Sequence, residues 1–323
     1  MASFLRSRKR VIPTLLAATC ILTLSGCAAF ESTTTQEADD QWQPAVADPA
    51  YPQASGPLVL VDAAHGNFHT IDGRFAPFAE LLRLDGYRVE SADTPAAPGL
   101  PGQGSVYVVA NAVLGGEEAT WALPTPSAFT LEEVAVIADW VRDGGALLLI
   151  ADHMPFPGSA AALADAFGIV FHDGYAMHSI EAGGGLAFTR ASGTLASHVI
   201  TDGRSKAEAI ESLRSFTGQA FRCVTPAEPL MYMPDDWFVY FPTAAGVFDE
   251  KTPFVSARGL VQGAALRIGK GRVAVFGEAA MFTAQSWVRD GVVGRMGMNH
   301  PEAPENAQFV LNVMHWLTGL LDD

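Results

Sequence analysis

The sequence predicts an α/β fold with a mostly parallel sheet, and three observations support this prediction. From Leu58 onward, short apolar runs alternate with stretches of helical periodicity, as in a layered domain of strands and helices. The apolar runs are continuous, which is typical of strands buried on both faces. Hydrophobic residues make up 49% of the 323 residues and charged residues only 17%, which indicates a folded domain with a large core.

The predicted elements follow in chain order. Strands are expected at residues 58–61, 87–89, 106–110, 146–150, 259–268 and 273–276, with a turn at 269–271 before the last of them. Helices are expected at residues 75–82, 131–141, 159–167 and 306–320. Thr130 and Glu133 form a capping box at the start of the second helix, and Gly144 and Gly145 end it. Residues 168–253 are less regular, so we expect loops and additional strands there.

Residues 1–26 are predicted to be a lipoprotein signal peptide. Four basic residues precede an apolar run at 11–24, which is too short to span a bilayer, since that needs about 20 apolar residues. Small residues then lead into Cys27, which would become the lipidated first residue of the mature chain. An ordinary cleaved signal or an N-terminal anchor helix is the alternative. Residues 27–57 are predicted to be this cysteine and a disordered tether, and residues 58–323 the folded domain.

The predicted location is the cell envelope, with the membrane as a partner through the lipid on Cys27. Ala28 and Ala29 follow this cysteine, with no Asp, so we expect the outer membrane facing the periplasm in a diderm host. The mature chain would carry 16 basic and 35 acidic residues, a net charge of −19. Such a charge repels nucleic acid and anionic lipid, so neither is an expected partner.

Cysteine usage predicts no internal disulfide. Cys20 is lost with the signal peptide and Cys27 would carry lipid, which leaves Cys223. Its neighbours at 221–224 indicate the edge of a strand, which favours a buried, inert thiol over a catalytic nucleophile.

Polar residues follow three predicted strands, at the edge where open parallel sheets bind ligands. We therefore expect a crevice formed by Asp62, His65, Asn67, His69, Asp152, His153 and Glu278, with His300 as a weaker member. The alternative is structural, because Asp commonly caps helices and Gly66-Asn67 can simply form a turn.

The same residues suggest limited chemistry. Asp152 or Glu278 could act as a general base with His153 as its partner. His65 and His69 are four residues apart, but Gly66 and Asn67 between them indicate a loop, so a helical His-x-x-x-His zinc motif is not expected. We predict neither a metal site nor a cofactor.

Taken together, the strand-end motifs resemble the class I glutamine-amidotransferase-like superfamily, and above all its extracytoplasmic members. The resemblance covers residues 58–320 and includes the Asp-x-x-His-x-Asn-x-His pattern that starts at Asp62. It also includes residues 147–153, 198–203 and 269–278. It implies a flavodoxin-like sheet with helices on both faces.

The catalytic cysteine of that superfamily is missing. The comparable turn after Ile150 offers Ala151-Asp152-His153, so covalent glutamine chemistry is not carried over. Three functions stay open: binding of a polar small ligand, such as a sugar or an envelope fragment, in the crevice; hydrolysis of envelope material, with or without a metal; and a scaffold role without crevice chemistry. Whether the chain is an enzyme is left open.

Overall fold

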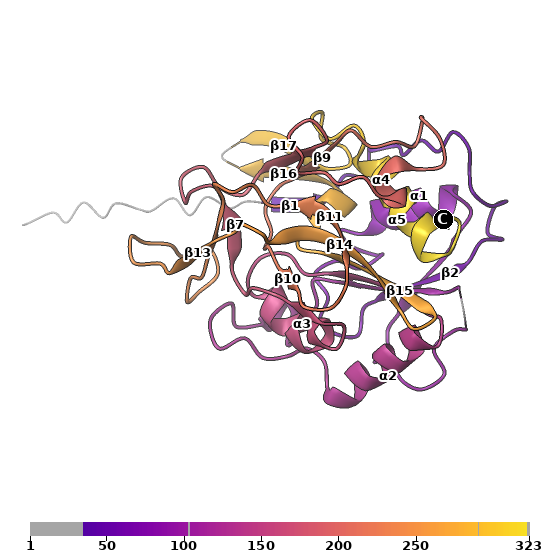
Figure 1. The fold of residues 1–323 in the computed structure, drawn as a ribbon, viewed down its shortest axis with the longest axis horizontal. Helices are drawn as coiled ribbons and strands as arrows, with labels where there is room; N and C mark the ends of the chain where they lie inside the picture. Colours follow the sequence, from indigo (N-terminus) through magenta and orange to yellow (C-terminus); the bar gives the residue numbers. More distant parts are fainter. Residues whose placement is uncertain (1–34, 103, 290, 322–323) are drawn as a thin grey trace, which may run out of the picture. The chain divides into compact units, whose positions relative to one another are not determined.

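The computed structural model describes residues 35–102, 104–289 and 291–321, and Figure 1 shows their fold. The predicted signal peptide and Cys27 therefore lie outside the described residues. None of the helices in the described ranges is long and apolar enough to cross a membrane.

The central sheet has seven strands in the order β11-β14-β15-β5-β4-β2-β3. Their bounds are Glu228–Tyr232 for β11, Val261–Ile268 for β14, Gly271–Phe276 for β15, Ala146–Ile150 for β5, Val106–Ala110 for β4, Leu58–Asp62 for β2 and Arg88–Ala92 for β3. The five strands β15, β5, β4, β2 and β3 are parallel to one another. Strand β14 is antiparallel to β15, and β11 is antiparallel to β14.

The predicted fold, a flavodoxin-like, mostly parallel sheet with helices on both faces, is wrong as a whole. Helices do pack against both faces of the central sheet, but that sheet is mixed and the other described sheets are antiparallel. Strands account for 29% of the structure and helices for only 18%. The hairpin at Gly269 and Lys270 is one cause, because it returns the chain antiparallel to β14. Apolar periodicity identifies a strand but does not report the direction of its neighbour.

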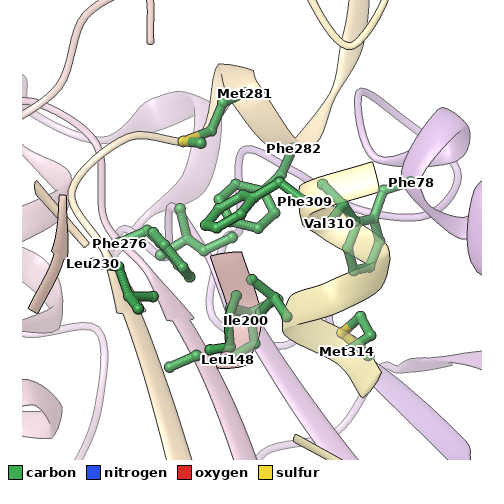
Figure 2. Packing of buried hydrophobic residues seen from close by; sticks show 14 of the residues in the cluster. Phe78, Leu148, Ile200, Leu230, Phe276, Met281, Phe282, Phe309, Val310 and Met314 are labelled. Atoms are coloured by element: carbon green, nitrogen blue, oxygen red, sulfur yellow. The ribbon is translucent and has the colours of Figure 1, made fainter. Parts of the chain in front are cut away.

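Four longer helices cover the two faces of the central sheet (Figure 1). Helices α1 (Ala76–Leu84) and α5 (Asn306–Leu317) share one hydrophobic core with the sheet, and α2 (Leu131–Arg142) and α3 (Phe156–Asp165) share the other. Figure 2 shows Phe276, Phe282 and Phe309 gathered between the sheet and α5. These rings are fully buried, and burial of each contributes roughly 1.5–3 kcal/mol to stability.

Additional strands form four small antiparallel sheets around this centre. The first contains β1 (Thr35–Ala38), β16 (Ala284–Arg289) and β17 (Val292–Gly297). The second contains β7 (Tyr175–Met177), β12 (Phe238–Tyr240) and β13 (Phe254–Ser256). The remaining pairs are β6 (Ile169–Val170) with β10 (Arg222–Cys223), and β8 (Leu186–Thr189) with β9 (Ser212–Ser215). The short helices are η1 (Gly116–Glu118), α4 (Val199–Asp202) and η2 (Ala280–Phe282). Many of these elements lie in the irregular middle, where extra strands are predicted.

Residues 35–57 correct the predicted tether. Strand β1 pairs with β16, and Trp42, Val46 and Tyr51 pack against the hydrophobic core. The Tyr51 hydroxyl also donates a hydrogen bond of 3.4 Å to Thr318 Oγ1. Although the composition of this segment is polar, these three apolar side chains hold it against the hydrophobic core. The folded domain therefore begins by Thr35 and not at Leu58.

Candidate functional site

A cavity of about 320 Å³ lies at the carboxyl ends of β4 and β5. It receives side chains from both ends of the described chain, because β1, β16 and β17 form part of its wall. The lining residues are Gln36, Phe68, His69, Arg74, Asn111, Trp121, Asp152, His153, Phe156, Thr217, Ala280, Gln285 and Met296. Three of the predicted site residues, His69, Asp152 and His153, thus meet in one cavity.

Asp152 is 5% exposed and is held by backbone amides. Its Oδ1 accepts a hydrogen bond of 2.7 Å from the His153 amide, and its Oδ2 accepts one of 3.3 Å from the Ala279 amide. Asp commonly makes such bonds in turns, so the structural alternative applies in part. The carboxylate nevertheless lines the cavity, where it can accept a hydrogen bond from a ligand.

Glu278 lies behind this site and does not line the cavity. Its side chain is fully buried, and its two oxygens accept hydrogen bonds from the amides of Ala280 and Met281 at 3.0 and 2.8 Å. Burial and the negative charge of Asp152 raise the pKa of Glu278 well above its usual range. Glu278 therefore fixes the start of η2 and is not placed to act as a base on a cavity ligand.

His153 presents one ring nitrogen to a fixed partner. Its Nδ1 lies 2.8 Å from the Met154 carbonyl oxygen, which requires the proton on Nδ1 and leaves Nε2 as an acceptor in the neutral ring. The ring stacks on Tyr175 with centroids 4.5 Å apart. Because Nδ1 bonds to a carbonyl and not to Asp152, the carboxylate–imidazole pair that the hydrolase prediction needs is not formed between these two side chains.

His69 is 4% exposed, and both of its ring nitrogens are buried without a hydrogen-bond partner. Burial, with smaller contributions from Arg74 and His153, lowers its pKa to about 3. The imidazole is therefore neutral at neutral pH and offers one donor and one acceptor. Leaving such groups unsatisfied costs about 1–3 kcal/mol each, so the site is built at the expense of stability.

Asn111 belongs to the site but is missing from the predicted residues. It directly follows β4, is 1% exposed and lines the cavity, and its Oδ1 accepts a hydrogen bond of 2.9 Å from the Asp152 amide. Its φ of 53° is the left-handed conformation that few residues other than glycine adopt. The rule that selected Asp62 and Asp152 would have found it, because Asn111 is the polar residue after the apolar run 106–110.

Asp62 and His65 form a separate buried cluster that does not line this cavity. The His65 Nδ1 lies 2.8 Å from Asp62 Oδ2, and its Nε2 lies 3.1 Å from Glu133 Oε1. Tyr107 also donates a hydrogen bond of 2.9 Å to Asp62. Burial lowers the pKa of His65, but the two carboxylates outweigh it, so the net shift is upward. These contacts connect the end of β2 to the first turn of α2.

Asn67 lines a second, larger cavity of about 680 Å³, which shares Gln36, Phe68 and Arg74 with the first. The Asn67 Oδ1 accepts a hydrogen bond of 3.1 Å from the His65 amide, and its Nδ2 is buried without a partner. Gly66 before it has a φ of 62°, and a Cβ there would lie 2.4 Å from the Val113 carbonyl oxygen. The glycine thus lets this loop approach the chain after β4.

His300 and Cys223 lie outside both cavities. His300 Nδ1 accepts a hydrogen bond of 3.1 Å from the Glu302 amide, and its ring packs edge-on against Phe216. Cys223 is half-buried in β10, and burial raises the pKa of its thiol to about 11. A thiol with this pKa is a weak nucleophile at neutral pH, as predicted for an inert cysteine.

The apolar wall of the cavity consists of Phe68, Trp121 and Phe156, whose ring centroids lie 5.6 Å apart in each pair. The Arg74 guanidinium carbon lies 4.2 Å from the centroid of the Phe68 ring. Across the described ranges, no group of three or more His, Cys, Asp or Glu side chains is arranged to hold a metal ion. The cavity thus combines an aromatic wall, whose rings are edge-on or tilted to one another, with a few fixed polar groups.

No protein-family model matches the chain, and no curated protein matches it either. Among solved structures it is similar to the mmIFT52 N-terminal domain, with a TM-score of 0.52 and 15% identity over 80% of this chain and 97% of that domain. It is also similar to a ThuA-like protein from Bacteroides uniformis ATCC 8492, with a TM-score of 0.41 and 10% identity over 83% of this chain and 94% of the other.

These comparisons have different weight. The first shows a shared fold and, at 15% identity, nothing more. ThuA-like proteins belong to the class I glutamine-amidotransferase-like superfamily, so the structures similar to this chain include a member of the superfamily that its motifs resemble. At a TM-score below 0.5, that likeness carries no functional argument.

Proposed function

We propose that this chain is a lipid-anchored domain of the cell envelope that binds a neutral, hydroxyl-rich small molecule, such as a sugar, in the 320 Å³ cavity. We also propose that it is an extracytoplasmic member of the class I glutamine-amidotransferase-like superfamily that lacks the catalytic cysteine. The strand-end motifs support the second proposal, and the cavity supports the first.

The observation that carries the binding proposal is His69. A neutral imidazole with an unpartnered donor and an unpartnered acceptor matches a hydroxyl group, which accepts one hydrogen bond and donates another. Because the two ring nitrogens point in different directions, two ligand hydroxyls would be needed, one that accepts a hydrogen bond from the N–H group and one that donates to the other nitrogen. An anionic group would satisfy only the donor.

The other walls fit the same ligand class. The rings of Phe68, Trp121 and Phe156 offer apolar contact to the flat face of a sugar ring. Asp152 adds an acceptor for hydroxyl protons at the cavity wall. Its negative charge and the positive charge of Arg74 line the same cavity and offset each other, which suits a neutral ligand. A cavity of about 320 Å³ lies at the lower end of the range of small-molecule sites, which suits one or two sugar rings.

Saturation-transfer NMR with a panel of neutral mono- and disaccharides tests this proposal. We expect transfer from the wild-type protein to at least one sugar, and at least a tenfold weaker affinity in His69→Phe, which removes both hydrogen-bonding atoms but keeps a ring. His178→Phe is the matched control, because His178 is exposed and outside the cavity. Absence of transfer from the whole panel, or equal binding by His69→Phe, contradicts the proposal.

The anchor is tested separately. Cys27→Ser removes the atom that would carry the lipid, so the chain should move from the membrane fraction to the soluble fraction. A Cys27→Ser protein that still sediments fully with membranes contradicts a lipid at this residue.

A further inference from the structure

The cavity of about 680 Å³ adjoins the proposed ligand cavity along one short loop after β2. Three consecutive residues make up this loop: Asn67 lines the larger cavity, His69 lines the smaller one, and Phe68 lines both. The Phe68 amide donates a hydrogen bond of 3.0 Å to the Asn111 carbonyl oxygen, which holds the loop at the end of β4. Side chains only two residues apart therefore belong to two adjoining cavities.

Gln36 and Arg74 line both cavities as well. The Arg74 Nε donates a hydrogen bond of 3.1 Å to the Gln36 carbonyl oxygen, and the guanidinium carbon lies 4.2 Å from the centroid of the Phe68 ring. Arg74 thus contacts both of the other residues that the two cavities have in common. These three residues form a connected boundary that the two cavities share.

Asn67 gives the larger cavity an unpaired hydrogen-bond donor. The His65 amide can only donate, so the Asn67 atom that accepts its hydrogen bond at 3.1 Å must be Oδ1, and this fixes the orientation of the side-chain amide. The Asn67 Nδ2 is then the buried atom without a partner. In the same way, His69 brings two unpaired ring nitrogens to the smaller cavity. One loop therefore supplies unpaired polar groups to both cavities.

The two cavities differ in how deeply their lining residues are buried. In the smaller cavity, Asn111 and His69 are 1% and 4% exposed. Glu37 and Asp72, which line only the larger cavity, are exposed residues. Their carboxylates are acceptors for hydroxyl protons and disfavour an anionic ligand. The smaller cavity is therefore the inner part of this region and the larger cavity the outer part.

We propose that the two cavities form one site for the end of a neutral oligosaccharide, with the terminal one or two rings in the smaller cavity and the following rings in the larger one. This inference rests on the proposed function, because it extends the same ligand class from the same cavity. The larger cavity is about twice the size of the smaller one, so it has room for roughly two further rings. The Asn67 Nδ2 donates a hydrogen bond to a hydroxyl of these rings, which makes Asn67 a residue that selects for chain length.

Calorimetric titration of the full chain in a sugar-free detergent tests this proposal with two neutral series. One series runs from glucose to cellotetraose, and the other from N-acetylglucosamine to its β-1,4-linked tetramer. In at least one series we expect the tetramer to bind at least tenfold more tightly than the monomer, because its linked rings occupy both cavities at once. The ratio of these two affinities in one and the same protein is called the length gain.

Asn67→Asp keeps the acceptor for the His65 amide but removes the donor at Nδ2, so the length gain should fall at least threefold. Gln53→Glu is the matched control, because it adds the same charge at an exposed residue that lines neither cavity. The control should keep the wild-type length gain. An unchanged length gain in Asn67→Asp would overturn the role of this residue.

Gly73→Phe tests the larger cavity without altering the Asn67 hydrogen bond. Gly73 lines this cavity, and an added Cβ would meet only Thr70, at 3.2 Å from its Oγ1 and 3.7 Å from its carbonyl oxygen. The added ring narrows the cavity, so the length gain should again fall at least threefold. Gly102→Phe should keep it, because Gly102 is exposed and an added Cβ there meets nothing within 4 Å. Superimposable thermal melts show that the variants are folded.

Failure of the extended site and failure of the proposed function give different results. If a sugar of the NMR panel binds and His69→Phe weakens its binding, but neither series shows a length gain, the proposed function stands and the extended site is refuted. If no sugar binds, or if His69→Phe binds as well as the wild type, the proposed function is refuted and the extended site falls with it.

Discussion

His65 and His69 lie four residues apart and are both buried, but the fold treats their imidazoles in opposite ways. The carboxylates of Asp62 and Glu133 hold His65 by its two ring nitrogens, whereas both nitrogens of His69 lack a partner. The first arrangement favours the charged ring and the second the neutral one. The two residues must therefore give opposite pH dependences of stability.

His65 is predicted to make the unfolding free energy decrease as the pH rises above 6.5. Its raised pKa means that the stabilisation is fully present below the ordinary value of 6.5 and is lost as pH rises through the raised pKa. The pKa of Glu133 is lowered, so the contribution of this carboxylate to stability is fully present above pH 4.5 and does not cause a decline at alkaline pH. His65→Gln should flatten the decline in unfolding free energy above pH 6.5, measured by urea titration at several pH values, while the exposed-residue control His178→Gln keeps the wild-type decline.

For His69 the predicted change falls on the acid side. The unfolded chain takes up a proton near pH 6.5, while the buried ring resists protonation until about pH 3. The unfolding free energy should therefore fall as pH drops below 6.5, and His69→Phe should remove this part of the acid sensitivity. A His69→Phe protein with the wild-type slope between pH 4 and 6.5 would show that the ring is protonated in the folded state.

The side chain and the backbone conformation of Asn111 make separate contributions to the stability of the fold. Asn111→Gly loses the hydrogen bond to the Asp152 amide but accepts the φ of 53°, whereas Asn111→Ala loses the bond and is strained as well. We expect Ala to lower the unfolding free energy by about 1 kcal/mol more than Gly does. Chemical denaturation of both variants measures the difference, and equal stabilities would argue against backbone strain.

At the scale of elements, α2 shows how one residue can serve two structures. Thr130 and Glu133 form the predicted capping box, and the Glu133 carboxylate also contacts His65 in the loop after β2. The first turn of α2 is thereby joined to the loop after β2, because His65 contacts both Glu133 and Asp62.

A double-mutant cycle tests this connection. Glu133→Gln and His65→Gln should each destabilise the protein, and their combined effect should differ from the sum by about 0.5–3 kcal/mol, as for groups in one hydrogen-bonded network. Thr130→Ala should cost about 1 kcal/mol through the cap and serves as the comparison. Additive effects of the two Gln substitutions would mean that the 3.1 Å contact contributes nothing.

The elements that sequence reasoning predicted best are those with strong local signals. The strands at 106–110 and 146–150 and the capping box of α2 are confirmed at the predicted residues. The pairing of β1 with β16 depends on a partner far along the chain, which periodicity does not report. The antiparallel direction of β14 relative to β15 is instead local, because the predicted turn at 269–271 joins these two adjacent strands. The same limit affects the site: a strand end places the backbone of Asp62 at the predicted edge, but Tyr107 and His65 turn its carboxylate away from the cavity.

At the scale of the whole domain, the segment before β2 is part of the fold. A chain that starts at Leu58 lacks β1 and exposes the surface that Trp42, Val46 and Tyr51 cover. We expect a loss of unfolding free energy on the order of 3 kcal/mol, since these side chains are only partly buried. Thermal denaturation measures it, with a chain that starts at Thr35, the first residue of β1, as the control. Equal melting temperatures would mean that residues 35–57 do not contribute to the stability of the domain.

The pairing of β1 with β16 also sets the order in which the cavity can be completed. The side-chain amide of Gln36 donates a hydrogen bond of 2.8 Å to Gln285, 249 residues later, and both side chains line the cavity. Closing so long a loop costs entropy before any contact rewards it, so this wall should form late in folding. The first strand of the domain therefore has no β partner until residues 284–289 are available to it. A break in the chain anywhere between β1 and β16 would turn this wall of the cavity from a contact within one chain into a contact between two fragments.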